Sequence, residues 1–312
     1  MICLFCILPA QTIYHAPFSG LVKISGFTII RNAVICDYPV VEAITSILPV
    51  VDEMIVLIGD CEDQTEMLIR SIPTDKIRIH HSVWDPNLKK SGEVLAVETD
   101  KAFQLIAPDS DWAFYIQADE VIHEKYHDAI RGAAEKYKTD LRVDGLLFNY
   151  LHFYGTYDYV GDSRKWYHKE VRIIRNDKSI HAYRDAQGFR RGTEKIRVKP
   201  IEAFVYHYGW VKNPRQMKEK VKKIHVYWED SDDKRTSEKN LAGELFDFSE
   251  FDSLRLFDSQ HPAVMKNRIA EKNWHVDLDI SKKNFSLKEK LLYWYEKKTS
   301  KRLFDFTNYR II

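Results

Sequence analysis

The sequence has few cysteines, almost no net charge and no long apolar run. Its 312 residues include four cysteines and carry a formal net charge of +1. Four cysteines give no disulfide framework for a chain of this length, which fits a reducing compartment. A charge near zero excludes a global electrostatic field that would recruit nucleic acid or acidic partners. The hydrophobic content of 45% and the charged content of 30% are those of an ordinary globular protein.

Segments that span or target membranes are also missing. The first ten residues, MICLFCILPA, are apolar, but they are too short to cross a bilayer and lack the basic region that begins a signal peptide. We interpret residues 1–22 as an N-terminal extension: a loose segment, a peripheral membrane contact or an upstream start that is not native. No other segment approaches a membrane span, so we expect a cytoplasmic protein, either free or at the inner face of the membrane.

Strand and helix patterns alternate through the first half of the chain. Short apolar or β-branched runs predict strands, and amphipathic runs between them predict helices. The predicted strands are Phe27–Arg31, Glu53–Ile58, Lys76–His80 and Asp111–Ile116, and the predicted helices lie between Asp37 and Pro49 and at Gln64–Ser71, Glu93–Ile106 and Glu124–Tyr137. This alternation predicts an α/β fold with a mostly parallel central sheet flanked by helices.

Beyond Val143 the pattern changes to strands without intervening helices. They are Gly145–Phe153, Val171–Arg175, Lys195–Val198 and Ala203–Tyr208. Such a run fits a mixed extension of the sheet that bears an acceptor-binding surface, and it equally fits an ordinary α+β tail. Helices at Asn213–Trp228 and Ser286–Lys298 predict a helical C-terminal extension, with a charged loop at Glu229–Asn240. We interpret the lysines of the first helix as a solvated face.

The stretch Asp111–Glu124, DWAFYIQADEVIHE, carries the strongest functional signal. A buried strand ends there abruptly in Gln117, Asp119 and Glu120. In open α/β sheets, ligands bind beyond the carboxyl ends of the strands. Two carboxylates at that place favour Mg²⁺ or Mn²⁺ bound together with substrate phosphates. The alternative is that the two acids only start a helix, where the helix dipole favours negative charge.

Polar residues end the neighbouring strands as well. Asn32 follows the first strand, and Asp60 and Asp63 follow the second, on the same edge of a parallel sheet as Asp119. Acids at this edge accept hydrogen bonds from the nucleoside in dinucleotide sites, whereas each one alone fits ordinary turn chemistry. The polar ends of three strands together favour a nucleotide site.

A second motif overlaps the stretch Asp111–Glu124. Residues His123 to His127 read HEKYH and match the HExxH pattern of zinc hydrolases. On a helix this spacing puts two histidines on one face. Here, however, the pattern starts a helix directly after a strand. Ile130 and Ala133 stand where the extended pattern has glycine and histidine. A zinc metallohydrolase that uses this segment is kept as an alternative, below the carboxylate interpretation.

In order and spacing, several segments resemble the family 2 glycosyltransferases of the GT-A fold. FTIIRNA resembles their opening strand, DYPVVEAITSILPVVDEMIVLIGDCEDQT their nucleotide-binding segment, GEVLAVETDKAF the helix before the metal motif, and IQADEVIHE a motif of the DxD type. VRIIRN and YHYGW resemble later strands of bacterial members. The resemblance implies a GT-A catalytic domain over residues 23–210, with a nucleotide-binding half (23–124) and an acceptor-side half (125–210), followed by the extension 211–312.

The resemblance also implies an activity: transfer of a sugar, with inversion, from a UDP- or GDP-linked donor to a glycan or lipid-linked acceptor in bacterial surface glycan synthesis. A divalent ion, Mn²⁺ or Mg²⁺, would neutralise the leaving diphosphate. The implied metal ligands are Asp119, Glu120 and His207. The implied contacts to the nucleotide-sugar are Arg31, Asn32, Asp60, Asp63, Lys90, Gly92, Gln117 and Asp119. A catalytically inactive nucleotide-sugar-binding protein with the same fold is the third hypothesis.

A carboxylate base would deprotonate the acceptor hydroxyl, and we expect it within or near Asp158–Glu170. Glu170 is the first choice and Asp162 the second. A surface ion pair with Lys169 or Arg172 is the alternative role for Glu170. His207 also has an alternative role: it is an ordinary core histidine instead of a metal ligand.

The sequence departs from the family pattern in two motifs. Gln117 occupies the place of the usual first aspartate of the metal motif, and Cys61 and Gln64 replace the usual serine and glycine of an S-x-D-G-T turn. Metal binding would therefore rest on Asp119, helped by Glu120.

Overall fold

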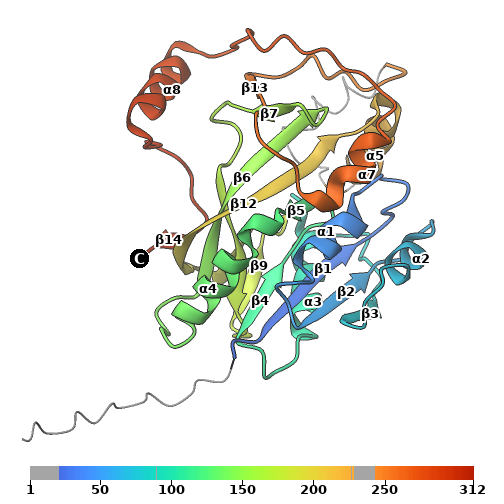
Figure 1. Cartoon of the computed structure of the whole chain (residues 1–312), viewed down its shortest axis with the longest axis vertical. Helices are drawn as coiled ribbons and strands as arrows, with labels where there is room; N and C mark the ends of the chain where they lie inside the picture. The colour runs from blue at the N-terminus through green and yellow to red at the C-terminus, as the bar shows by residue number, and fades with distance from the viewer. Residues whose placement is uncertain (1–20, 89, 226, 228–242) are drawn as a thin grey trace, which may run out of the picture.

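Four parallel strands form the first half of the central sheet (Figure 1). The structure, a computed structural model, describes residues 21–88, 90–225, 227 and 243–312. The strands are β1 (Ile24–Ile30), β2 (Glu53–Ile58), β3 (Ile77–His81) and β4 (Trp112–Tyr115), arranged in the order β4-β1-β2-β3. They are connected by α1 (Val40–Ile47), α2 (Thr65–Arg70) and α3 (Glu93–Gln104). The predicted α/β fold with a mostly parallel central sheet is confirmed.

Apolar cores on both faces bury this sheet, because successive residues of a strand point to opposite sides. On β1, Ile24 and Ile30 belong to the core shared with α1, α2 and α4 (His127–Tyr137). Phe27 and Ile29 belong to the core shared with α3. Burial on both faces is typical of parallel sheets, and it leaves the carboxyl edge as the place where polar side chains of the sheet meet a ligand.

Longer strands extend the sheet beyond β4. β8 (Lys169–Arg175) runs antiparallel between β4 and β6 (Gly145–Gly155), and β12 (Arg197–Val211) runs parallel to β6. The short strands β5 (Glu120–Ile122) and β14 (Arg310–Ile311) pair with β12, β7 (Tyr159–Gly161) pairs with β6, and β13 (Leu254–Leu256) pairs with β7. A small separate sheet of β9 (Ile180–Tyr183), β10 (Gly188–Arg191) and β11 (Glu194–Lys195) packs beside α3.

One continuous strand, β12, stands where the sequence predicts two. Separate strands were expected at Lys195–Val198 and Ala203–Tyr208, and that prediction is wrong, because β12 pairs with β6 through both regions. The pairing shifts its register between Pro200 and Phe204, next to a proline that lacks the N–H of a ladder hydrogen bond. The shift lets the strand continue through the region that looks like a break in the sequence.

The segment after residue 210 returns to the sheet. The boundary expected at 210 lies within β12, and α5 (Pro214–His225) follows that strand almost directly. The later helices are η2 (Ala263–Met265), α7 (Lys266–Ala270) and α8 (Leu287–Thr299), and β13 and β14 add strands that the sequence did not predict. Residues 1–20 of the extension expected at 1–22 and the whole of the loop expected at 229–240 lie outside the described residues. No helix in the described part of the chain is long and apolar enough to cross a membrane.

Candidate active site

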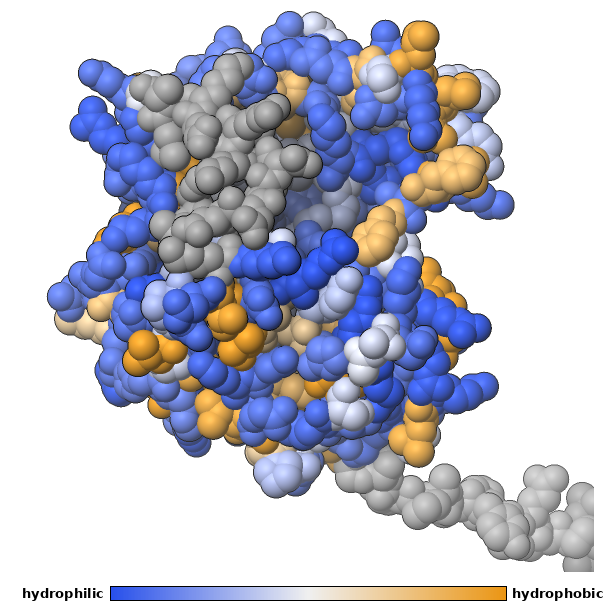
Figure 2. All heavy atoms as spheres, turned by 180° about the vertical axis from the view of Figure 1, so that it is seen from behind, coloured by the Kyte–Doolittle hydropathy of each residue, from blue (hydrophilic) through white to orange (hydrophobic). Residues whose placement is uncertain are grey.

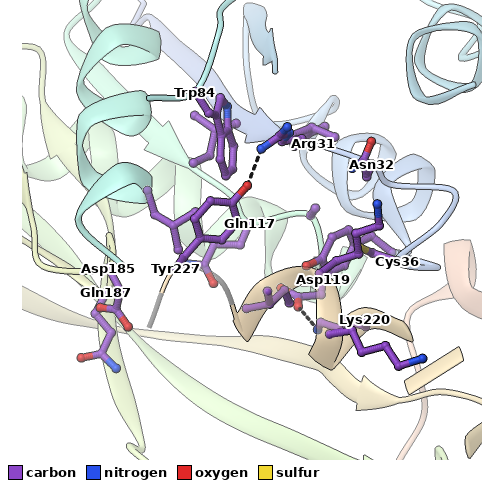
Figure 3. Close-up of a pocket in the computed structure, with 18 of the residues that line it drawn as sticks. Arg31, Asn32, Cys36, Trp84, Gln117, Asp119, Asp185, Gln187, Lys220 and Tyr227 are labelled. Atoms are coloured by element: carbon purple, nitrogen blue, oxygen red, sulfur yellow. Dashed lines mark hydrogen bonds and ion pairs between the residues drawn. The ribbon is translucent and has the colours of Figure 1, made fainter. Parts of the chain in front are cut away.

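A cavity of about 490 Å³ lies at the carboxyl ends of β1 and β4, a size typical of small-molecule sites. Its lining includes residues from both strand ends, from the loop after β3, from the turn between β9 and β10, and from α5 and just beyond: Arg31, Asn32, Trp84, Gln117, Asp119, Asp185, Gln187, Lys220, Lys223 and Tyr227. Figure 3 shows Asp185 and Gln187 on one side of this cavity and the pair Asp119 and Lys220 on another. Seen from behind, the molecule has a hollow with a mostly hydrophilic rim (Figure 2).

The end of β1 supplies Arg31 and Asn32. Asn32 has φ 54°, a left-handed conformation that asparagine adopts more readily than most residues, and its Oδ1 accepts a hydrogen bond of 2.7 Å from the backbone N–H of Glu62. The guanidinium of Arg31 forms an ion pair of 2.7 Å with Asp60 and donates a hydrogen bond to the hydroxyl of Tyr227. Asp60 does not line the cavity; it holds Arg31 at the rim.

Three other residues that were predicted to contact the nucleotide-sugar do not line the cavity: Asp63, which follows β2, and Lys90 and Gly92, which precede α3. Asp63 accepts hydrogen bonds from the backbone N–H groups of Val34 and Ile35, at 3.0 and 2.8 Å, and so shapes the loop after β1. Gly92 precedes α3 with φ 71°, and its N–H donates to the carbonyl of Tyr227. Lys90 is exposed, and its carbonyl accepts from the first turn of α3.

Asp119 is the acid that reaches the cavity from β4. Its Oδ2 lies 3.1 Å from Nζ of Lys220, and its Oδ1 lies 3.7 Å from Nε2 of His207. Burial raises the pKa of this carboxyl, but attraction to the nearby ammonium groups, above all that of Lys220, outweighs burial, so the pKa of Asp119 lies below its ordinary value. The carboxylate therefore stays ionised, with one oxygen directed to an ammonium and the other to an imidazole.

Glu120, its neighbour, points into the protein and is fully engaged. Its two oxygens accept hydrogen bonds of 2.7 and 2.8 Å from the guanidinium of Arg172, and the hydroxyl of Tyr150 adds a third at 2.8 Å. The backbone N–H of Gln117 donates a fourth. Both charged side chains of the pair are fully buried. Glu120 thus has its coordinating oxygens occupied, and the expected metal ligands reduce to Asp119 and His207.

Gly209 lies against these two side chains and leaves room beside them that any larger residue would fill. A Cβ on Gly209 would lie 2.7 Å from Oδ2 of Asp119 and 2.7 Å from Nε2 of His207. In the described part of the chain, no three His, Cys, Asp or Glu side chains are grouped to hold a metal. Two protein ligands suffice where substrate phosphates complete the coordination, as is usual for Mg²⁺. Imidazole suits transition metals better, so this donor pair favours Mn²⁺ over Mg²⁺.

The two acids expected as the catalytic base lie away from the cavity lining. Asp162 is bound by the hydroxyl of Tyr293 and by Nζ of Lys297, at 2.5 and 2.8 Å. Glu170 is buried on β8 beside Gly188 of the small sheet. Burial raises the pKa of Glu170 to about 7.

This buried carboxyl group makes the stability of the protein depend on pH. A pKa raised to about 7 in the folded state, against 4.5 in the unfolded state, means that the folded protein binds the extra proton between these values. We therefore expect the free energy of unfolding to fall as pH rises from about 4.5 to about 7, by about 3 kcal/mol from this group. Glu170→Gln should remove that fall, measured by urea denaturation at several pH values. If the free energy of unfolding of Glu170→Gln depends on pH as that of the wild type does, Glu170 is not the source of the fall.

The turn between β9 and β10 brings an acid into the cavity that the sequence analysis missed. Arg184 and Ala186 both have a left-handed backbone, with φ 57° and φ 60°, which is strained for residues other than glycine and is common at functional sites. Between them lies Asp185, and burial raises its pKa above the ordinary value. Nothing in the sequence distinguishes Asp185 from other acids in loops, because tertiary packing creates its position.

The opposite wall comes from α5, whose lysines were interpreted as solvated. For Lys220 that interpretation is wrong: the residue is 9% exposed, and its Nζ donates to Asp119 and to the carbonyl of Gly209 at 3.1 and 2.8 Å. Met217 is buried one helical turn earlier on the same face. The helical spacing of Met217, Lys220 and Ile224 was the signal that could have indicated an inward lysine.

The HEKYH segment forms no zinc site. His123 precedes the short 3-10 helix η1 (Glu124–Tyr126), and His127 begins α4, so the two histidines do not lie one turn apart on a single α-helix. Nε2 of His127 lies 2.8 Å from the carbonyl oxygen of Ser46. Since a carbonyl only accepts, this nitrogen carries a proton and is not free to bind a metal. The two histidines therefore do not have the geometry that the zinc hypothesis requires.

The fold and the cavity define an α/β protein with a candidate ligand site at the carboxyl edge of parallel strands, the place where open α/β sheets bind their ligands. No family model matches the chain, and no curated protein matches it.

Several solved structures are similar to the chain at low sequence identity. The S. aureus TarS fragment 1-349 in complex with UDP is 15% identical over 71% of this chain and 70% of its own, with a TM-score of 0.37. Glucosyl-3-phosphoglycerate synthase from Mycobacterium tuberculosis in complex with Mn²⁺, UDP and phosphoglyceric acid is 19% identical over 47% and 52%, with a TM-score of 0.30. 4-Diphosphocytidyl-2C-methyl-D-erythritol synthase from Anaerococcus prevotii is 13% identical over 66% and 96%, with a TM-score of 0.34.

Proposed function

We propose that the protein is a GT-A-type glycosyltransferase that moves a sugar from a nucleotide-sugar, UDP- or GDP-linked, to an acceptor hydroxyl with inversion. One observation carries the proposal. A single cavity at the carboxyl edge of the sheet is lined by a carboxylate (Asp119), a lysine (Lys220) and a separate, half-buried acid (Asp185), and His207, which does not itself line the cavity, contacts Asp119 from behind the lining. The sequence resemblance supports a glycan or lipid-linked acceptor in bacterial surface glycan synthesis.

The donor has a binding surface suited to each of its parts. Arg31, Trp84 and Tyr227 form one wall, where the two aromatic rings lie 5.6 Å apart and the guanidinium lies 5.7 Å from the Trp84 ring centre. Such a wall suits stacking against a nucleobase. Lys220 and Lys223 line the side formed by α5, and lysine ammonium groups bind phosphate as point charges. We therefore propose that the diphosphate lies between α5 and the end of β4.

Asp119 and His207 would hold a divalent ion, Mn²⁺ in this proposal, together with the diphosphate of the donor. The chemistry that it would supply is neutralisation of the negative charge on the leaving diphosphate. Lys220 remains at the other oxygen of Asp119 and adds positive charge on the same side. Gln117, which replaces the usual first aspartate, lines the cavity as an uncharged contact to the donor.

Asp185 is proposed as the base, in place of Glu170 and Asp162. The acceptor oxygen attacks the anomeric carbon from the face opposite the diphosphate. A bond from that oxygen to the carbon forms, the bond from the carbon to the diphosphate oxygen breaks, and the hydroxyl proton passes to the Asp185 carboxylate. The burial that raises the pKa of Asp185 makes it a better proton acceptor. The single displacement inverts the configuration at carbon.

A donor screen tests this function. UDP or GDP with Mn²⁺ is expected to raise the melting temperature, because a ligand that binds the folded state stabilises it. Asp119→Ala should abolish the increase. The sugar-nucleotide identified in this way should then release its nucleotide in the presence of an acceptor. Binding without transfer or hydrolysis, across a broad set of acceptors, would instead show an inactive nucleotide-sugar-binding protein.

Gly209→Ala is expected to weaken the binding of Mn²⁺ with UDP by at least roughly tenfold, because the new methyl group fills the space between Asp119 and His207. Isothermal titration calorimetry measures the loss. Gly132 in α4 is the matched control, since a Cβ there meets nothing within 4 Å. Gly132→Ala should bind normally and gain up to about 1 kcal/mol in the free energy of unfolding. Normal binding of Mn²⁺ with UDP by Gly209→Ala would contradict an ion site between Asp119 and His207.

A further inference from the structure

A chain of hydrogen bonds leads from the proposed cation site into the core. Nδ1 of His207 lies 3.2 Å from Nδ1 of His152, and Nε2 of His152 lies 2.8 Å from the carbonyl oxygen of Tyr167. The two histidines are direct register partners on the parallel strands β12 and β6, so the sheet itself places them side by side.

This chain determines where the protons lie. A carbonyl oxygen only accepts, so Nε2 of His152 carries a hydrogen atom. His152 is 3% exposed and stacks on Tyr150 and Trp166, with ring centres 5.5 and 5.2 Å away. An imidazole with its single hydrogen atom on Nε2 has an acceptor at Nδ1, the atom that faces His207. His207 must then donate from its own Nδ1.

The consequence appears at the other end of the His207 ring. With its proton on Nδ1, a neutral His207 has a lone pair on Nε2, the atom that lies 3.7 Å from Oδ1 of Asp119. A lone pair and a carboxylate oxygen that face each other at this distance make no hydrogen bond. A cation between them satisfies both. The other tautomer would direct an N–H at the same place and repel a cation.

We propose that His152 is a positioning residue that holds His207 in the tautomer able to bind a divalent cation together with Asp119. The inference rests on the metal site of the proposed function and adds a residue that touches neither the cation nor the donor. Hydrogen-bond partners of metal-binding histidines act in this way in general, and their loss lowers metal affinity 10- to 100-fold.

Two substitutions separate the hydrogen bond from the packing. His152→Phe keeps a ring between Tyr150 and Trp166 but removes the acceptor for His207. His152→Asn loses the ring but offers a carbonyl oxygen near the position of Nδ1. Mn²⁺ affinity in the presence of UDP, titrated by electron paramagnetic resonance, should fall 10- to 100-fold in the phenylalanine variant and stay within about threefold in the asparagine variant.

Nitrogen-15 NMR of histidine-labelled protein reads the tautomer without any metal. In the wild type, Nδ1 of His207 should be protonated and Nε2 unprotonated, whereas His152→Phe should show a mixture. Wild-type affinity in His152→Phe, or an asparagine variant as weak as the phenylalanine variant, would overturn the inference but not the proposed function. Failure of the wild type to bind Mn²⁺ with UDP would overturn the inference and the metal role together.

Discussion

Asp185→Asn is expected to lower kcat for sugar transfer by roughly 10²- to 10⁴-fold, the usual contribution of a positioned base. The amide has nearly the same shape as the carboxylate but cannot take the acceptor proton. Donor binding should persist, because the cavity places Asp185 on a different side from Asp119 and Lys220 (Figure 3). Steady-state kinetics with varied donor and acceptor separate the two effects.

Controls for this prediction come from the acids that the sequence favoured. Asp162→Asn and Glu170→Gln alter carboxyl groups that do not line the cavity, so both variants should keep kcat close to that of the wild type once the folded fraction is taken into account. A loss of kcat in Glu170→Gln as large as that expected for Asp185→Asn would indicate that Glu170, on β8, is the base. An Asp185→Asn variant with normal kcat would remove Asp185 from the mechanism.

Arg172→Leu is expected to lower the free energy of unfolding by roughly 3–5 kcal/mol, because it leaves the carboxylate of Glu120 buried without its counter-charge. Both side chains of this pair are completely buried. The guanidinium also lies 5.4 and 5.3 Å from the ring centres of Tyr115 and Tyr150. In addition, it donates to the carbonyl of Gln187 in the cavity-lining turn, so the substitution should loosen the turn that carries the proposed base.

Urea denaturation with the two single variants and the double variant measures this coupling. Replacing Glu120 as well, in Glu120→Leu with Arg172→Leu, should recover part of the lost stability, because no unpaired charge remains buried. Arg142 offers a control, since it makes a similar forked contact with Asp140 at the surface, where its side chain is 79% exposed. Arg142→Leu should leave the urea midpoint nearly unchanged. Equal effects of Arg142→Leu and Arg172→Leu would contradict the role assigned to burial.

The parallel half of the sheet was predictable because it is encoded locally. Each strand from β1 to β4 is a short apolar run, and each connection has its own helical pattern, so neighbouring residues alone are sufficient to indicate an α/β fold. The placement of Asp119 followed from a general rule about strand ends. The same local reasoning failed near Pro200, where pairing with β6 carries one strand across an apparent break.

Adjacent acids at the end of β4 show how far local reasoning extends. Asp119 lines the cavity, while Glu120 begins β5 and points into the core toward Arg172. Asp119 lies in a turn that is closed by a hydrogen bond from the N–H of Glu120 to the carbonyl of Gln117, and this change of chain direction sends the two side chains to different sides. The sequence does not say which of the two faces the cavity, because Arg172 lies 52 residues away on another strand.

The remaining site residues depend on contacts between distant parts of the chain. Asp185 reaches the cavity through a strained turn of the small sheet, and Lys220 through the contact of α5 with the turn after β4 and with Gly209 on β12. His152 and His207 meet because β6 and β12 pair in parallel, although they are 55 residues apart. No local pattern encodes such a pairing.

The central claim is that a divalent cation lies between Asp119, His207 and the donor diphosphate. Pulsed electron paramagnetic resonance of Mn²⁺ bound to the protein with UDP tests it most directly, because the spectrum reports the nuclei that contact the ion. The account predicts coupling to phosphorus and to one histidine nitrogen, with loss of the nitrogen coupling in His207→Ala. Phosphorus coupling without any histidine nitrogen in the wild type, or an unchanged nitrogen coupling in His207→Ala, would contradict it.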